Sequence, residues 1–450
     1  MSATRYASIL DLGFGDSGKG RFVDVLVRRW RAHTVVRFCG GAQAGHTVAA
    51  PAAEGNGARH HTFAQFGAGT FVAGTRTVLL DPFVLHPTAL LVEAQVLSRC
   101  GVTDALSRLA VDGRCRITTP FHQAAGRLRE IRRGREPHGT CGVGVGETVR
   151  QSLEHPAHTI RYADLAGPEP AVVEKLHAQR ETLLSEFGGT SAAEADAVAE
   201  MHVLKDESVA LRWLGAARAL ARQRPPASLD SLRAQLCLPG SVIFEGAQGI
   251  LLDEWRGFHP HTTWSSTTPG ALEAAMQPFG LPARIEHHGV IRTYLTRHGS
   301  GPFPTEDPRL EARLPEPHNH SGGWQGRFRR GHPDAVLLRY AIDAAPGLVG
   351  LLVSHMDALE RGAPLLWCER YAVGGSSPFS PGIDRLSHGE HGDLNHQSRL
   401  TRLLFEALPH YSAQPLASAG DFLDRVASVT DLPVVLTSHG REAEAVRGSL

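Results

Sequence analysis

The sequence has no excess charge of either sign. Its 46 Lys and Arg residues balance its 46 Asp and Glu residues, so the formal net charge is zero. Proteins that bind nucleic acids or anionic membranes through their general field usually carry a basic excess. We therefore expect no nucleic-acid partner and no membrane partner, and any anionic ligand must meet a local cluster of positive groups.

Cysteine is scarce, and long apolar runs are missing. The six cysteines are scattered without any C-x-x-C spacing, which indicates a reducing compartment and neither structural zinc nor a disulfide framework. No apolar run reaches the length of a membrane-spanning helix, and the first residues, MSATRYASILDLG, contain no apolar core long enough for a signal peptide. We expect a cytoplasmic protein.

Glycine is abundant, with 48 residues, and it gathers in loops that follow apolar stretches. Residues 6–12 predict a buried strand that enters the first glycine loop, residues 22–31 predict a helix, and residues 33–38 predict a second strand. Further glycine loops lie at 40–47, 138–148 and 246–249. This order predicts an α/β fold with a large, mostly parallel central sheet and ligands at the strand ends.

The remainder of the chain predicts more strands and a helical excursion. Further strand candidates are 241–249, 290–299 and 348–357. Residues 84–110 show helical periodicity, and a segment rich in Ala, Glu, Leu and Arg predicts a helical subregion at about 165–235. Because no internal repeat is visible, we expect a single catalytic domain over residues 1–450.

The first glycine loop, GFGDSGKG at residues 13–20, fits the phosphate-binding pattern G-x-x-x-x-G-K with two departures. Gly20 stands where Ser or Thr normally provides the hydroxyl that holds Mg²⁺. Asp16 places a carboxylate beside the phosphates, which is repulsive unless a metal or a proton transfer uses it. Lys19 favours phosphate binding through its point charge. An ordinary strand–helix turn is the alternative at this point.

Several motifs together resemble one enzyme family. GFGDSGKGRFVD resembles the GDEGKGKIVD loop of the adenylosuccinate synthetases, and GGAQAGHT resembles their GGHNAGHT. FEGAQGILLD with the following HTTWSSTTPG is similar to FEGAQGTLLD…VTSSNTT, and TRHGSGPFPTE is similar to TRVGAGPFPTE. GRFRRGHPD resembles the arginine-rich amino-acid loop of the family. The motifs follow the family order from residue 8 to about 357.

The resemblance implies a homodimeric ligase of purine nucleotide biosynthesis that uses GTP and Mg²⁺. In such an enzyme a base takes the N1 proton of inosine monophosphate, and the 6-oxygen attacks the γ-phosphate of GTP. The amine of L-aspartate then displaces the 6-phosphoryl group. An amide-like oxygen needs deprotonation at N1 to attack phosphorus and needs phosphorylation to leave, so each step has a chemical reason.

The matched positions imply the residues of the site. The implied catalytic residues are Asp16, His46 and Gln248, with Asp16 as the base. The implied Mg²⁺ ligands are Asp16 and the Gly45 carbonyl. The implied GTP-binding residues are Gly15, Ser17, Gly18, Lys19, Gly20, Gly45, His46, Thr47, His355 and Asp357. The implied substrate-nucleotide residues are Asp16, Gln43, Thr140, Cys141, Gln248 and Thr263. The implied amino-acid-binding residues are Arg327, Arg329, Trp324 and Gln325.

Simpler interpretations stand beside these roles. A lone Asp or His is usually a turn, capping or packing residue, and Gln248 could brace a turn. The arginines at 327–330 could form a solvated charge run, whereas Arg297 is a further candidate for anion binding. Three histidines of the polar segment 375–398 predict a solvated loop rather than a metal site: His388, His391 and His396.

Several departures from the family motifs fall on substrate positions. At these positions this sequence has Ser17 in place of glutamate, Gln43 in place of asparagine, Cys141 in place of threonine, Val143 in place of arginine, and Trp324-Gln325 in place of a Thr-Thr pair. In the family, an arginine extends into the site from the partner subunit. That arginine has no clear counterpart here, and Arg150 and His155 are candidates for its position.

Recognition of the second nucleotide depends on two positions. Asp357 could accept two hydrogen bonds from guanine, which favours GTP over ATP, although His355 replaces a lysine. The leading hypothesis is a ligase for L-aspartate and inosine monophosphate. The alternatives are a paralogue with another 6-oxopurine nucleotide or amine donor, and a nucleotide-binding regulator without turnover.

Overall fold

A computed structural model describes residues 4–50, 59–134, 137–188, 195–319, 321–373 and 382–450. A nine-stranded sheet with the order β17-β16-β13-β10-β1-β9-β2-β5-β7 forms its centre. Every neighbouring pair in this sheet is parallel except β16–β17. Its strands are β1 (Arg5–Asp11), β2 (Thr34–Arg37), β5 (Arg76–Leu79), β7 (Leu109–Val111), β9 (Ser241–Glu245), β10 (Ile285–Arg292), β13 (Leu348–Ser354), β16 (Val434–Ser438) and β17 (Val446–Gly448). The predicted α/β class is confirmed.

Four two-stranded ribbons and a set of helices surround this sheet. The ribbons are β3 (His46–Ala50) with β4 (Arg59–Phe63), β6 (Val84–Leu85) with β8 (Arg116–Ile117), β11 (Leu295–His298) with β12 (Phe328–Gly331), and β14 (Cys368–Val373) with β15 (Ala407–Tyr411). The helices before β9 are α1 (Lys19–Trp30), α2 (Pro87–Arg99), α3 (Pro120–Arg133), α4 (Val145–Glu154), α5 (Glu169–Phe187), α6 (Ala195–Lys205), α7 (Glu207–Gln223) and α8 (Leu229–Leu236). The later helices are α9 (Pro269–Met276), α10 (Ala335–Ala344), α11 (Met356–Glu360), α12 (Leu394–Glu406) and α13 (Ala419–Val429).

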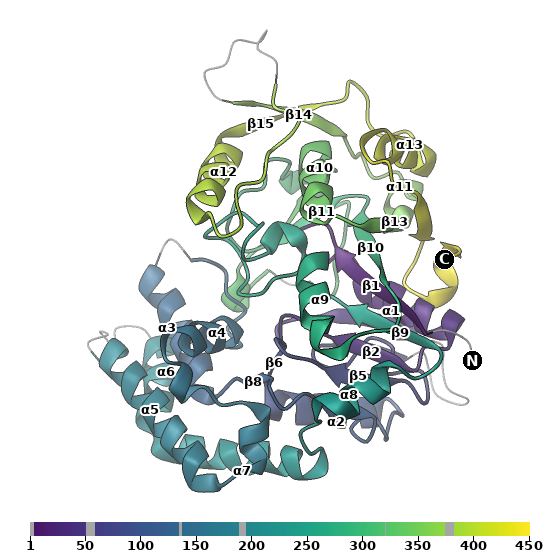
Figure 1. Ribbon diagram of the computed structural model, residues 1–450. Helices are drawn as coiled ribbons and strands as arrows, with labels where there is room; N and C mark the ends of the chain where they lie inside the picture. The colour runs from purple at the N-terminus through teal and green to yellow at the C-terminus, as the bar shows by residue number, and fades with distance from the viewer. Residues whose placement is uncertain (1–3, 51–58, 135–136, 189–194, 320, 374–381) are drawn as a thin grey trace.

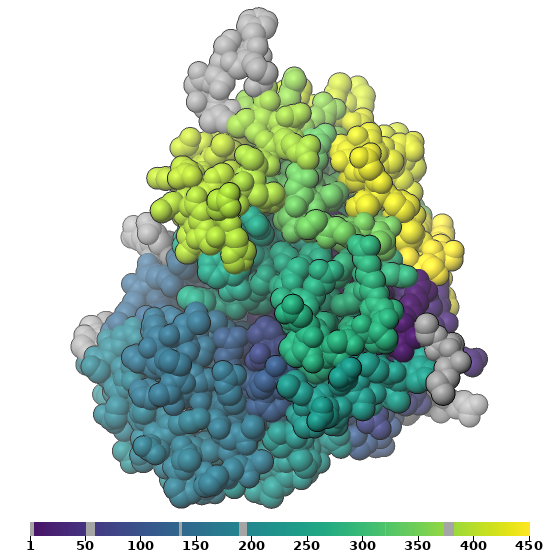
Figure 2. Space-filling model, in the orientation of Figure 1, coloured from purple at the N-terminus to yellow at the C-terminus, as the bar shows by residue number. Residues whose placement is uncertain are grey.

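The helices gather at two ends of the molecule. Figure 1 shows α3 to α7 together beyond β6 and β8, and α10 to α13 with β14 and β15 at the opposite end. Figure 2 shows the same two regions as separate masses, blue-teal at the lower left and yellow-green at the top. The helical subregion expected at about 165–235 corresponds to α5 through α8. Among the described residues, no helix combines the length and apolar character needed to cross a membrane.

The first strand is packed between apolar clusters, with Tyr6 and Leu10 in one and Ile9 in another. All residues of β1 after Arg5 are buried, as expected for a parallel strand covered on both faces. Ile9 packs in a cluster with Phe22 and Leu26 of α1, whereas Leu12, just beyond the strand, packs in a second cluster with Tyr340 of α10. The glycine loop that follows β1 is therefore anchored from both sides.

Three sequence predictions need correction. Residues 290–299 form the end of β10 and the separate hairpin strand β11, because the chain turns where Thr293 donates its N–H to the Ser354 carbonyl at 3.2 Å. The helical periodicity of 84–110 holds only for α2, which is followed by Gly101 with φ +83 and later by β7. The polar segment 375–398 lies partly outside the described residues. Its last part is the start of α12, where the Asp393 side chain accepts the His396 N–H at 2.9 Å.

Two buried histidines make stability depend on pH. Burial lowers the pKa of both His122 in α3 and His288 in β10 to about 4. Below about pH 6.5 these histidines are therefore protonated in the unfolded chain but stay neutral in the folded chain. Folding stability falls as the pH drops from 6.5 toward 4.

We expect the free energy of unfolding to fall by about 2 kcal/mol for each of these histidines between pH 7 and pH 5. Denaturant titrations at both pH values measure this change. His288→Leu should make the decline shallower by about one proton, and a decline that is identical in the variant would contradict the assignment.

Candidate active site

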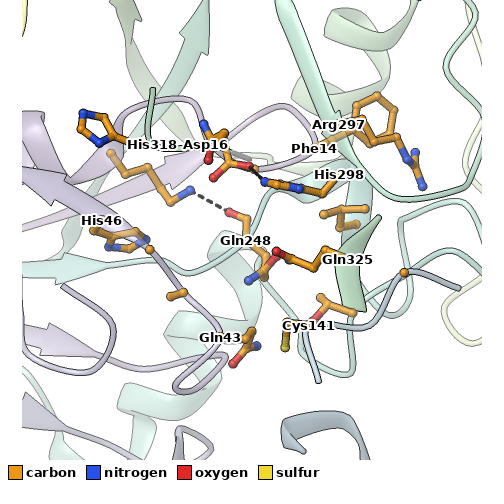
Figure 3. Close-up of a pocket in the computed structure, with 18 of the residues that line it drawn as sticks. Phe14, Asp16, Gln43, His46, Cys141, Gln248, Arg297, His298, His318 and Gln325 are labelled. Carbon is orange, nitrogen blue, oxygen red and sulfur yellow. Dashed lines mark hydrogen bonds and ion pairs between the residues drawn. The ribbon is translucent and has the colours of Figure 1, made fainter. Parts of the chain in front are cut away.

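A cavity of about 940 Å³ opens at the carboxyl ends of β1, β2, β9, β10 and β13. Ligands of open α/β sheets generally bind at this edge. Figure 3 shows Asp16, His46, Gln248 and His298 pointing into the same space from different loops. The structure thus brings three implied catalytic residues together, although they are up to 232 positions apart in the chain.

The loop after β1 is folded around a buried ion pair. The Nζ of Lys19 lies 2.8 Å from Oδ2 of Asp11, and the two side chains are 3% and 0% exposed. The Asp11 carboxylate also accepts the N–H groups of Gly13 at 2.8 Å and Ser17 at 3.1 Å. Asp11 therefore holds the loop in shape and fixes the start of α1, where Lys19 meets the cavity.

The structure explains why Gly20 replaces the usual hydroxyl residue. A Cβ added to Gly20 would lie 2.9 Å from the Cβ of His46 and 3.1 Å from its carbonyl carbon. Any side chain here would displace the loop that carries His46. The departure from the phosphate-loop pattern is therefore a packing requirement of the second glycine loop.

Asp16 stands at the top of the first loop in a left-handed conformation, with φ 56. Its carbonyl accepts a hydrogen bond from Arg292 at 2.8 Å, and its Oδ2 lies 3.6 Å from Nε2 of His298. Burial raises the pKa of Asp16, while His298, Lys19 and Arg292 oppose that rise. A carboxylate that is costly to ionise yet surrounded by cations is suited to accept and release a proton.

His46 is held by a carboxylate that the sequence reasoning did not single out. Nδ1 of His46 lies 2.6 Å from Oε1 of Glu245, whose other oxygen accepts the Ala68 N–H at 3.0 Å. Burial lowers the pKa of His46 to about 4, against the opposing effect of Glu245. Although burial raises the pKa of Glu245, His46 and Arg37 bring it below its usual range. With Nδ1 donating to Glu245, Nε2 is the remaining polar atom of the ring.

Gln248 belongs to a loop that is locked against the first one. Gln248 has φ 62, and its carbonyl accepts a hydrogen bond from Lys19 at 3.0 Å. A Cβ on the neighbouring Gly249 would lie 2.1 Å from the Gly13 carbonyl oxygen, so only glycine permits this approach. The Gln248 side chain is left to line the cavity.

Most other predicted nucleotide residues also line the cavity. These are Gly15, Gly18, Gly20, Gln43, Gly45, Thr47, Thr140, Cys141, Thr263, His355 and Asp357. The amide oxygen of Gln43 is buried and has no hydrogen-bond partner among the described residues. Ser17 is different, because it is buried and its Oγ lies 3.4 Å from the Gly15 carbonyl.

The cavity is also lined by the residues predicted to bind the base of GTP. His355 has φ 60, and its Nδ1 lies 2.8 Å from the Ser354 hydroxyl. The Asp357 carboxylate forms an ion pair with Arg361, whose side chain is 60% exposed. An exposed pair of this kind is weak, so a ligand can compete for the carboxylate.

The predicted amino-acid loop is placed beside the cavity. Of its residues, Gln325 lines the cavity, while Arg327 pairs with Glu311 at 3.3 Å and Arg329 pairs with Glu306 at 2.9 Å. Arg297 also lines the cavity, but among the described residues its guanidinium donates only to backbone carbonyls, at 3.1 to 3.3 Å.

Trp324 docks this loop onto the third glycine loop. A Cβ on Gly142, which has φ +69, would lie 2.5 Å from Cδ1 of Trp324. The Arg127 guanidinium lies 5.7 Å from the Trp324 ring centroid, and its Nε donates to the Gly142 carbonyl at 3.0 Å. The loops predicted for the nucleotide and for the amino acid are thus in direct contact. We name this contact the Trp324–Gly142 junction.

Residues 138–140 of the third glycine loop are also held by a side chain of α3. The Glu130 carboxylate of α3 accepts the Gly139 N–H at 2.9 Å and the Thr140 N–H at 3.4 Å. Arg150 pairs with Glu147 and Glu154 of its own helix, and His155 stacks on His158. Which of Arg150 and His155 serves a partner subunit stays a prediction.

The three histidines of the polar segment have structural partners. Nε2 of His388 lies 3.1 Å from the Tyr340 carbonyl, and Nε2 of His396 lies 2.9 Å from the Ser387 carbonyl. His391 lies 5.3 Å from the Trp255 ring. Over the described ranges, no group of three or more His, Cys, Asp or Glu side chains is arranged to hold a metal ion.

Comparisons with known proteins agree with this geometry. A family model for adenylosuccinate synthetase matches residues 8–447. The adenylosuccinate synthetase of Syntrophotalea carbinolica is 31% identical over 447 residues, which cover 96% of this chain and 95% of that protein. That of Bordetella avium is 31% identical over 443 residues, with the same coverage.

Two solved structures are similar in fold. The fully ligated adenylosuccinate synthetase from Plasmodium falciparum has a TM-score of 0.78 at 20% identity, covering 99% of this chain and 100% of that one. The cyanophage S-2L succinoaminodeoxyadenylate synthetase, bound to dGMP and to dATP as an energy donor, has a TM-score of 0.58 at 15% identity, covering 100% of this chain and 95% of that one. From its sequence motifs, its central sheet and these matches, the chain belongs to the adenylosuccinate synthetase family of ligases that form a carbon–nitrogen bond.

Proposed function

We propose that the protein joins L-aspartate to C6 of inosine monophosphate at the expense of GTP. The observation that carries the proposal is the position of Asp16, which faces a cavity lined by Lys19, His46 and Gln248. A partly buried carboxylate beside cationic groups is suited to a ligand with a proton to give. The N1–H beside the 6-oxygen of a 6-oxopurine is such a proton.

The chain's own groups account for the individual steps. Asp16 takes the proton from N1, and the 6-oxygen gains the charge that lets it attack the γ-phosphorus. Lys19 and the N–H groups at the start of α1 offset the charge on the phosphates. His46 lies where the 6-oxygen and the γ-phosphate meet, and bound phosphates would raise its pKa toward the imidazolium form that donates from Nε2. The amine of aspartate then attacks C6, and phosphate leaves.

The residues present fit a bound Mg²⁺. Asp16 and Gly45 both line the cavity and would supply a carboxylate and a carbonyl oxygen, the ligand types that Mg²⁺ prefers. The His298 Nε2 lies 3.6 Å from the Asp16 Oδ2, beyond hydrogen-bond distance, so that oxygen is free to coordinate. Phosphate oxygens and water would complete the shell, which fits the absence of an all-protein cluster among the described residues. When bound, the ion would neutralise charge on the transferred phosphoryl group.

Arg297 and the 324–329 loop are proposed to receive the amino acid. Arg297 is buried without a carboxylate partner within the described structure, and Arg329 lies close enough to lower its pKa further. Arg327 and Arg329 would exchange Glu311 and Glu306 for the carboxylates of the ligand.

The single domain over 1–450, the cytoplasmic location and the homodimer remain proposals. Leu153 lines the cavity with its side chain 67% exposed, which supports a partner surface there.

A second candidate is a paralogue with another donor or acceptor nucleotide. The observation that favours it is the donor end of the cavity, where His355 replaces the expected lysine and Asp357 is already paired with Arg361. The cyanophage synthetase of similar fold is bound to dGMP and to dATP as an energy donor, which supports this candidate. A regulator without turnover is less well supported, because it would not need Asp16.

The test is phosphate release from GTP in the presence of Mg²⁺, inosine monophosphate and L-aspartate, with each component omitted in turn. We expect release only in the complete mixture, together with a new ultraviolet-absorbing product. Release with a different nucleotide or amine would support the paralogue. Nucleotide binding without release under any combination would leave only the regulator.

A further inference from the structure

Three histidines gather at one wall of the cavity, and the mechanism above uses none of them. His138, His259 and His261 all line the cavity. His138 begins the third glycine loop, whereas His259 and His261 stand shortly before Thr263, which is predicted to bind the acceptor nucleotide. The ring centroids of His138 and His261 lie 5.7 Å apart. Two segments distant in the sequence thus bring imidazole rings to the same place.

Ser300 joins these two segments. Its hydroxyl donates to the Pro137 carbonyl at 2.5 Å, and its Oγ lies 3.4 Å from Nδ1 of His261. Because the hydroxyl proton is committed to Pro137, the Oγ accepts from Nδ1, and the neutral His261 ring carries its proton there. The Phe405 ring of α12 packs against the same imidazole, with the centroids 5.8 Å apart. Nε2 of His261 is therefore left with a lone pair that can take up a proton.

The surroundings of the two rings are mainly positive. The groups that act most strongly on His261 are all arginines or histidines: Arg297, Arg329, His259 and His138. Those that act on His138 include one carboxylate, from α3: Arg133, Glu130 and His259. Burial and the cationic neighbours lower the pKa of His261 to about 4, and burial also lowers the pKa of His138. Both rings are therefore mostly neutral at pH 7 in the free protein, and an anion between them would relieve the repulsion.

The pair lies where one end of the acceptor nucleotide is expected, a step that rests on the proposed function. There Asp16 faces N1 of the purine, and Figure 3 shows Cys141 on the far side of Gln248 from Asp16. The 5′-phosphate, at the opposite end of the nucleotide, would thus lie beside the third glycine loop. That loop has Val143 where the family has arginine, and His138 is the only basic residue within 138–148. The phosphate therefore meets no permanently charged side chain of this loop.

We propose that His138 and His261 form an anion site that binds the 5′-phosphate of the acceptor nucleotide and takes up protons as it does so. The phosphate favours the imidazolium form, in which every ring nitrogen is a donor and the hydrogen bonds are charge-assisted. The phosphate is a dianion above its second pKa of about 6. Because binding is linked to protonation of the rings, affinity for the acceptor nucleotide rises as the pH falls from about 8 to about 6.5.

The test is calorimetric titration of the protein with inosine monophosphate alone, in two buffers of different ionisation enthalpy. We expect an uptake of roughly one proton per nucleotide at pH 7, and an affinity about three- to tenfold higher at pH 7 than at pH 8. Inosine, which lacks the phosphate, should bind without proton uptake.

Two variants assign the protons to the pair. His138→Ala and His261→Phe, which keeps an aromatic ring against Phe405, should each weaken inosine monophosphate roughly 10-fold at pH 7 and leave the affinity for inosine unchanged. The double variant should show no proton uptake. His177→Ala, a change of an exposed histidine on α5, is the matched control and should behave as wild type.

The outcomes separate this inference from the proposed function. Equal proton uptake in the wild type and the double variant would overturn the inference. So would variants that raise KM for L-aspartate alone, since the pair would then hold a carboxylate of the amine donor. If no ligase turnover occurs but the proton-coupled binding is lost in the double variant, the function fails and the inference stands. If inosine monophosphate does not bind, inorganic phosphate is titrated in its place, and absence of proton-coupled phosphate binding would overturn the inference. If His261→Phe does not fold, His138→Ala alone should lower the proton uptake, and an unchanged uptake would contradict the site.

Discussion

Asp16→Asn should lower ligase turnover by roughly 10²- to 10⁴-fold, the usual contribution of a positioned general base. The amide cannot accept the N1 proton, although it keeps the size and shape of the carboxylate. Asn also tolerates the left-handed conformation that this residue adopts, with φ 56, so the loop should keep its geometry. Phosphate release under saturating substrates measures the effect.

Two controls make that result specific. The Asp230→Asn variant changes an exposed aspartate in the first turn of α8 and should keep full turnover. In the absence of Mg²⁺, the GTP affinity of Asp16→Asn, measured by calorimetry, should be retained, because a repulsive carboxylate has been removed from beside the phosphates. Turnover in Asp16→Asn within a factor of about three of wild type would show that Asp16 is not the base.

Lys19→Met should damage both catalysis and stability. Removing the charge takes away phosphate stabilisation and should lower kcat/KM for GTP by roughly 10²- to 10³-fold. It also leaves the Asp11 carboxylate, which is fully buried, without the cation 2.8 Å away. Breaking a buried pair from one side costs about 3–5 kcal/mol. Denaturant unfolding at pH 7 measures that loss.

The double variant Asp11→Asn with Lys19→Met separates the two effects. Removing both charges should return part of the stability lost in Lys19→Met, because no unpaired charge is left buried. Catalysis should stay low, since the phosphate-binding charge is still missing. If the single variant unfolds at the wild-type denaturant concentration, the buried pair does not hold the loop.

The sequence predicted the glycine loops and five strands of the central sheet because their signals are local. The apolar residues of β1, the loop 13–20 and Lys19 are consecutive, and burial confirms what their order indicates. The turn between β10 and β11 was missed because its determinant is remote: the Thr293 N–H bonds to the Ser354 carbonyl, 61 positions away. Periodicity within one window carries no such information.

The site was predictable only in part, for the same reason. Asp16, His46 and Gln248 stood out through their motifs, whereas Glu245 lay inside the FEGAQG motif without an assigned role. Its function became visible once β9 placed Oε1 of Glu245 2.6 Å from Nδ1 of His46. His298 was marked in the sequence by nothing more than one difference from the family motif, because no sequence pattern indicates that β11 lies beside the first glycine loop.

The Trp324–Gly142 junction has a thermodynamic consequence for substrate binding. The Trp324 indole packs so closely on Gly142 that a methyl group there would clash with it, so a shift of the Gly142 backbone toward the indole also displaces Trp324. A nucleotide that orders residues 138–144 therefore also orders part of the loop that receives the amino acid. If the nucleotide raises the affinity for the amino acid by some factor, the amino acid raises the affinity for the nucleotide by the same factor. The two binding constants are therefore thermodynamically linked.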